Sequence, residues 1–108
     1  MDEVIQILEE LEEQGIPYAY DHFAEGEGPD PPFICYRCPN SDNFAADGTV
    51  YFPITEIDIE LYTDRKDPET EKKLEDLLVK SGIFFEKTET WIDSEKLYEV
   101  LYSFEQEA

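Results

Sequence analysis

Apolar residues near the start of the chain recur with the period of an α-helix. One stripe of the predicted helix carries the apolar side chains of Val4, Ile5, Leu8 and Leu11. Asp2 can cap the first turn, and Gly15 can adopt the left-handed conformation in which many helices end. The pattern therefore predicts an amphipathic helix between these two residues, with its glutamates in solvent.

A second helical pattern begins after the middle of the chain. Its apolar stripe consists of Leu74, Leu77 and Leu78. Asp67 stands at a capping position, and Pro68 follows at the first helical position, where a missing N–H is tolerated. Gly82 provides the stop, so the sequence predicts a second amphipathic helix.

The stretch from Thr55 to Tyr62 alternates apolar and acidic residues with the period of a β-strand. Its apolar side chains are Ile57, Ile59 and Leu61, and its acidic side chains are Glu56, Asp58 and Glu60. Successive side chains of a strand point to opposite faces of the sheet. We therefore predict a strand with one buried face and one acidic face in solvent.

Shorter strands are predicted from apolar runs that turn residues interrupt. They are Tyr18–Tyr20, Phe33–Cys38 and Thr49–Phe52. Pro39 ends the second of them, and Pro53 is expected to break the third at an edge or a bulge. Two segments read as loops: residues 25–32, rich in Gly, Pro and acid, and the turn-rich SDNFAADG at residues 41–48.

The last third of the chain is typical of a β-hairpin. Residues 83–92 and 97–105 are the two strands, and Tyr98, Val100, Tyr102 and Phe104 share one face of the second. A helix is the alternative, because Leu97, Val100, Leu101 and Phe104 also fit a 3.6-residue period. Aromatic and β-branched residues in the partner segment favour the strand.

These elements fit one domain over residues 1–108, of a size that supports a single core. The predicted class is α+β: a mixed or antiparallel sheet of about five to six short strands, two amphipathic helices and a C-terminal β-hairpin.

Charge excludes several kinds of partner. The chain has 28 Asp and Glu against 8 Lys and Arg, a net charge of −20 at pH 7. Nucleic-acid binding and anionic membranes both require basic side chains that displace counterions or meet lipid headgroups, so neither is expected. The acidic N-terminus is unlike a signal peptide, and no stretch approaches a membrane span, so we expect a cytoplasmic protein.

Candidate catalytic and metal-binding groups are few. Cys35 and Cys38 form CYRC, but His22 is the only other soft ligand, and a structural zinc needs four. We expect two reduced, partly buried strand cysteines and no metal or cofactor. A hard cation on the acidic strand face is less favoured than a solvated face. Without a nucleophile elbow or a glycine-rich phosphate loop, the sequence does not indicate an enzyme.

Three stretches carry a resemblance to a known family: YDHFAEG, SDNFAADGTVY and ELYTDRKDPE. Together with their surroundings, from Ile16 to Glu105, they resemble small proteins of long-tailed phages and prophages of Gram-positive bacteria. Those proteins are similar to tail-terminator or tail-completion proteins. The resemblance implies a ring, usually hexameric, that caps the tail tube and docks it to the head connector. It also implies assembly in the host cytoplasm and a final location at the head–tail junction of the virion.

A ring subunit needs interfaces between its copies, and aromatic side chains are favoured at interface centres. The candidate contacts are Phe44, Tyr98, Tyr102 and Phe104. In such a ring, Glu56, Asp58 and Glu60 could face the lumen and repel packaged DNA. The alternative function is an acidic DNA mimic that inhibits a host DNA-binding enzyme. A mimic would carry its carboxylates as two regular tracks, whereas a terminator would form a closed ring.

Overall fold

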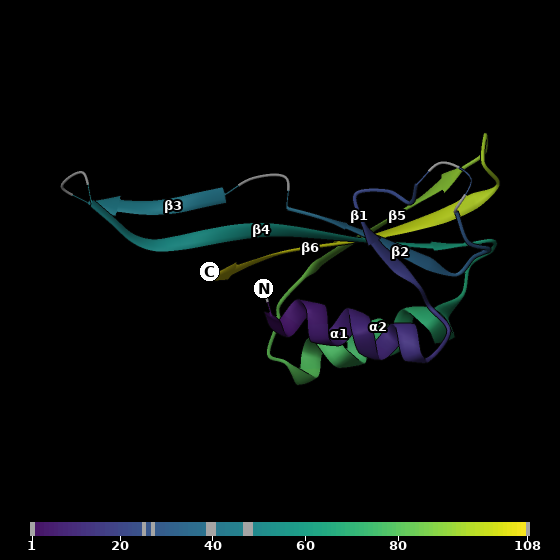
Figure 1. Cartoon of the computed structure of the whole chain (residues 1–108), viewed down its shortest axis with the longest axis horizontal. Helices are drawn as coiled ribbons and strands as arrows, with labels where there is room; N and C mark the ends of the chain where they lie inside the picture. The colour runs from purple at the N-terminus through teal and green to yellow at the C-terminus, as the bar shows by residue number, and fades with distance from the viewer. Residues whose placement is uncertain (1, 25, 27, 39–40, 47–48, 108) are drawn as a thin grey trace.

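Two helices lie on one face of a mixed six-stranded sheet in the computed structural model of the chain (Figure 1). The structure describes residues 2–24, 26, 28–38, 41–46 and 49–107, with backbone alone for 41–46, 49–53 and 107. The helices are α1 (Asp2–Glu13) and α2 (Pro68–Lys80). The strands are β1 (Tyr18–Tyr20), β2 (Phe33–Arg37), β3 (Ser41–Ala46), β4 (Thr49–Thr63), β5 (Glu86–Ile92) and β6 (Leu97–Glu107).

The strands follow the order β1-β2-β4-β6-β5, and β3 pairs with β4 beyond the end of β2. Only β1 and β2 are parallel, and all other pairs are antiparallel. The class is therefore α+β, as the sequence predicts. The β3–β4 hairpin extends away from the two helices and gives the molecule its long axis of 49 Å (Figure 1).

Both helices end in the same way, with a glycine followed by a buried isoleucine. Gly15 and Gly82 have positive φ angles of 91° and 73°, which favour glycine. The amide of Ile83 donates to the carbonyl of Leu78 at 2.9 Å, and Ile16 bonds to Leu11 in the same manner at 3.0 Å. This Schellman pattern satisfies the last carbonyls and directs each isoleucine into the core.

The start of α2 agrees with the sequence prediction, whereas α1 already begins at Asp2, which therefore lies inside the helix. Asp67 accepts hydrogen bonds from the amide of Thr70 at 3.2 Å and from its hydroxyl at 2.7 Å. These bonds outweigh the effect of burial and lower the pKa of the Asp67 carboxyl. Pro68 occupies the first position of the helix.

The core lies between the helices and the sheet. The alternation predicted for β4 is confirmed, because Ile57, Ile59 and Leu61 are buried beneath the helices. Their neighbours across the β4–β6 pairing are Phe104, Tyr102 and Val100, which are also buried. The final segment is therefore a strand, and the helical alternative for it is wrong.

Two local predictions are wrong. Residues 41–46, predicted as part of a turn-rich loop, form β3. Pro53 does not break the strand either, because β4 continues without interruption from Thr49 to Thr63. At Pro53 the strand pairs with Asn43 on one side, while on the other side β6 ends opposite Ile54. Proline is tolerated there because one edge of the strand needs no ladder hydrogen bond from it.

Candidate protein-binding face

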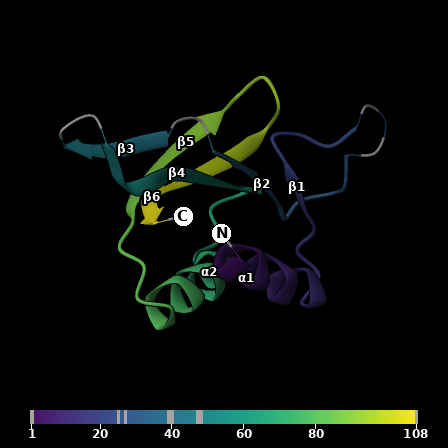
Figure 2. The same cartoon turned by 60° about the vertical axis from the view of Figure 1, so that its left-hand side comes forward.

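Within the described part of the chain, the face of the sheet opposite the helices is covered by no other element (Figure 2). We call it the open face. The register of the strands places on it alternate residues of three central strands: Phe33, Cys35 and Arg37 of β2, Glu56, Asp58, Glu60 and Tyr62 of β4, and Glu99, Leu101, Ser103 and Glu105 of β6. Glu56, Asp58 and Glu60 thus point away from the core, as predicted, although all three are half-buried.

Arg37 is the only cation that the described strands place on the open face. Its Nε lies 3.1 Å from Oε1 of Glu60, and its Nη2 lies 3.9 Å from Oδ2 of Asp58. The Ser103 hydroxyl donates to Asp58 at 2.7 Å, and the Tyr62 hydroxyl donates to Glu60. The face therefore holds its carboxylates in a hydrogen-bonded cluster with an excess of negative charge.

The centre of the open face is partly dehydrated. Burial raises the pKa of Glu99, and the charge of nearby Glu60 raises it further. Burial also raises the pKa of the Tyr62 hydroxyl, as does its hydrogen bond to Glu60. A partner that covered this face would have to supply cations or donors, because unpaired buried carboxylates are costly.

An aromatic row borders the carboxylates. The rings of Phe33 and Tyr62 stack with centroids 5.0 Å apart, and Phe23 meets Phe33 edge-on at 5.6 Å. All three side chains are half-buried. Aromatic side chains are enriched at interface centres. Phe23 and Phe33 lie in the segment from Asp21 to Phe44, whose aromatic side chains the sequence also predicts to contact a partner. Tyr62 was not predicted, although it continues the series Glu56, Asp58, Glu60 by one more step of two residues.

The predicted aromatic contacts need correction. Tyr102 is 0% exposed and Phe104 is 5% exposed, so both belong to the core and cannot contact a partner directly. Burial of Tyr102 is possible because its hydroxyl donates to Glu75 at 2.7 Å. Tyr98 is partly buried on the helix side of the sheet, beside Trp91. Phe44 lies in β3 opposite Phe52, and its side chain is outside the described residues.

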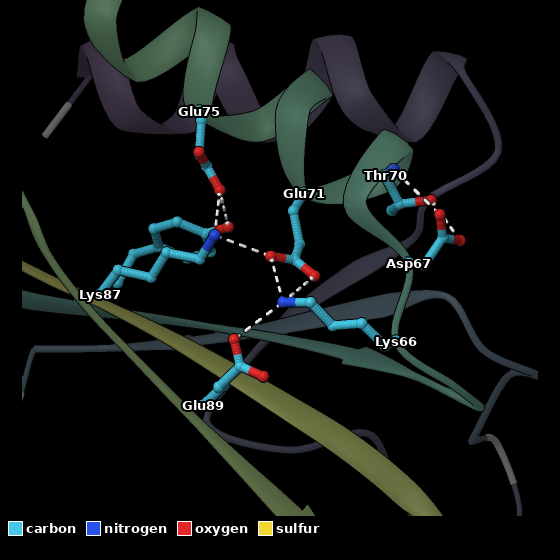
Figure 3. A network of polar contacts seen from close by, with 8 residues as sticks. Lys66, Asp67, Thr70, Glu71, Glu75, Lys87 and Glu89 are labelled. Atoms are coloured by element: carbon cyan, nitrogen blue, oxygen red, sulfur yellow. Dashed lines mark hydrogen bonds and ion pairs between the residues drawn. The ribbon is translucent and has the colours of Figure 1, made fainter.

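A second charged cluster joins α2 to β5 on the helix side of the sheet (Figure 3). The carboxylate of Glu71 is 3% exposed, with Nζ of Lys87 2.7 Å from Oε1 and Nζ of Lys66 2.9 Å from Oε2. Lys87 also contacts Glu75 at 2.8 Å, and Lys66 contacts Glu89 at 2.8 Å. Burial by itself would raise the pKa of Glu71, but hydrogen bonds from the two lysines outweigh burial and lower it. The ion pairs of this cluster connect α2 to the sheet.

The cysteines lie on different sides of the sheet. Cys35 is buried on the open face, whereas Cys38, just after β2, packs against the core, and neither forms a disulfide. Burial, with the charges of Glu60 and Asp21, raises the pKa of Cys35 to about 11. A thiol of this kind is neutral at physiological pH and a poor nucleophile. His22 is exposed, with Nδ1 3.0 Å from Asp21.

Across the part of the chain that the structure describes, no three His, Cys, Asp or Glu side chains are grouped to hold a metal ion. Neither α1 nor α2, the helices of the described ranges, is long and apolar enough to cross a membrane. No protein-family model and no curated protein matches the chain.

Proposed function

We propose that this protein is a structural subunit of phage or prophage assembly, a tail terminator or head–tail joining protein. It forms a ring with copies of itself, caps the tail tube and binds the head connector, and it catalyses no reaction. The observation that carries the proposal is the open face, where half-buried aromatic rings and carboxylates lie beside each other with no covering element in the described chain.

The distribution of charge supports a ring. Five of the eight basic residues lie between positions 65 and 80, namely Arg65, Lys66, Lys72, Lys73 and Lys80. Three of them belong to α2, which lies on the opposite side of the sheet from the open face. Lys72 is paired with Asp76 of the same helix at 2.7 Å, so Lys73 and Lys80 are the lysines of α2 that can meet open-face carboxylates of the next copy. Such a head-to-tail contact closes into a ring when the rotation between copies permits it.

The proposal is tested by adding a positive charge to the open face. Leu101 is half-buried on this face, directly opposite Glu60. Leu101→Lys leaves the fold intact, because the new ammonium lies among carboxylates, but it repels the lysines of a neighbouring α2. Ser94→Lys, in the exposed β5–β6 turn, makes the same change of charge away from the face and is the control.

The readouts are native mass spectrometry of the purified protein and electron microscopy of particles from the encoding phage. We expect Leu101→Lys to abolish the ring and to give overlong or headless tails, while Ser94→Lys gives normal virions. Normal virions from a folded Leu101→Lys variant would refute the assignment. Tight binding of the wild-type monomer to a DNA-binding enzyme would instead favour the DNA mimic, which the net charge of −20 permits.

A further inference from the structure

Phe84 is the most exposed of the large apolar side chains described, with 94% of its surface in solvent. It lies in the short connection between α2 and β5. The residues that line grooves together with it include Glu3 at the start of α1, Glu86 at the start of β5, and Glu105 and Gln106 near the end of β6. A single exposed apolar residue is ordinary on a protein surface. Phe84 differs because both of its neighbours are anchored and because its side chain lines two grooves.

Both neighbours of Phe84 are anchored in the protein. The amide of Ile83 bonds to Leu78 at 2.9 Å, and its side chain is 8% exposed. The ring of Phe85 packs edge-on against Tyr102, with centroids 5.2 Å apart. Because the side chains of both neighbours pack into the protein, Phe84 points outward. The anchored neighbours hold the backbone at Phe84 in place, which reduces the backbone entropy that a partner would have to remove on binding.

The side chain of Phe84 lines two grooves. The first is lined by Glu56, Phe84, Phe85, Glu86, Ser103, Phe104 and Glu105. The second is lined by Glu3, Ser81, Gly82, Ile83, Phe84, Glu105 and Gln106. Their charged side chains are all carboxylates. Such a surface matches a segment that carries Lys or Arg side chains.

We infer that Phe84 and its two grooves form a docking site for a basic, apolar segment of another protein. Leucine-like side chains of this segment straddle the Phe84 ring, and its Lys or Arg side chains pair with Glu86 and Glu105. The inference concerns a different partner and a different anchor residue from the proposed ring, although Glu56, Ser103 and Glu105 belong both to the first groove and to the open face. Hot spots of binding are typically a buried aromatic anchor surrounded by such polar contacts.

The test measures binding of the full chain to a synthetic amphipathic Leu/Lys peptide by fluorescence anisotropy, with a Leu/Glu peptide for comparison. Because burial of a phenylalanine ring contributes strongly, Phe84→Ala should weaken binding about tenfold or more. The control is Val79→Ala, an exposed apolar residue of α2 that lines neither groove, which should change binding less than about twofold. Glu105→Gln should weaken binding and reduce its dependence on salt.

Three results would overturn the inference. The first is equal binding of the Leu/Lys peptide by the Phe84→Ala variant, which would indicate attraction to charge alone. The second is equal binding of the Leu/Glu peptide. The third is a change of oligomeric state in Phe84→Ala, seen by native mass spectrometry, which would make the patch a contact between copies. The Leu101→Lys variant separates the two proposals, because it should lose the ring and keep the peptide.

Discussion

Removal of both lysines around Glu71 is the sharpest test of how α2 is held to the sheet. In the variant Lys66→Met, Lys87→Met, the carboxylate keeps its 3% exposure but loses both of its close cations (Figure 3). Methionine retains the length and apolar surface of the lysine stem, so packing changes little. The experiment therefore isolates the charge.

The expected loss of unfolding free energy is about 3–5 kcal/mol, the usual consequence of leaving a buried charge unpaired. That is a large share of the roughly 5–15 kcal/mol that stabilises a domain. Lys66→Met alone should cost about 1 kcal/mol, because this lysine is 40% exposed and Lys87 remains in place. Adding Glu71→Leu to the double variant should restore stability to within about 1 kcal/mol of the wild type.

The pH dependence has a defined sign. In the wild type the pKa of Glu71 is lowered, so its stabilising contribution is present above the unfolded-state pKa and is lost as pH falls through the folded-state pKa. In the double variant, burial without cations should raise the pKa of Glu71. Acidification should then stabilise the double variant relative to the triple variant, since protonation removes the unpaired charge.

Urea denaturation followed by circular dichroism, at several pH values, measures both effects. Comparison of the double with the triple variant cancels the titration of the many other carboxylates. A loss below about 1 kcal/mol in the double variant, with no difference in pH dependence from the triple variant, would refute the reasoning. It would mean that Glu71 reaches solvent when the lysines are removed.

Two further predictions concern single residues. Because burial raises the pKa of Cys35 to about 11, its thiol should react with a maleimide at pH 8 far more slowly than in the urea-unfolded protein, and more slowly than the less buried Cys38. Peptide mass spectrometry after brief labelling measures these rates, and equal rates would contradict the prediction. Gly82→Ala should lower the free energy of unfolding, measured in urea, by about 1 kcal/mol, because φ is +73° although no atom lies within 4 Å of an added Cβ. Gly28→Ala is equally open but has no positive φ, so it should lower the free energy of unfolding by under about 0.5 kcal/mol. Equal losses would show that the backbone conformation is not the cause.

The elements that the sequence predicts correctly are those with local signals. The 3.6-residue stripes define both helices, and the strict alternation from Thr55 to Tyr62 defines the central part of β4. The helix stops are also local, since glycine followed by isoleucine supplies both the positive φ and the buried side chain. Each of these features needs information from only a few neighbouring residues.

The missed elements depend on a partner distant in sequence. SDNFAADG has the composition of a turn, yet residues 41–46 pair with the first half of β4, from Ser41 opposite Thr55 to Ala46 opposite Thr49. The ladder to β4 pairs the backbone groups on one edge of β3, and this outweighs their weak strand propensity. Because of the same pairing, β4 continues without interruption at Pro53.

Only the part of the candidate site that depends on local alternation could be predicted from the sequence. Alternation identifies Glu56, Asp58 and Glu60 as one face, but Arg37 and Phe33 reach that face through the β2–β4 register, which no local pattern encodes. Tyr102 was assigned to an interface because aromatic side chains are favoured at interface centres. Glu75, 27 positions earlier and on α2, supplies that partner and lets the ring enter the core.

The net charge of −20 opposes association of copies into a ring, but the distance between charges decides how strongly it does so. Exposed charges separated by more than about 8 Å are largely screened at physiological salt, and the molecule is 49 Å long. Most carboxylates of adjacent copies are therefore too far apart to repel, whereas α2 lysines against the open face would be within contact distance. At low salt the long-range repulsion returns and should keep subunits apart. Under the proposed function, assembly should consequently be weak at low salt, strongest near physiological salt, and weak again when contact pairs are screened.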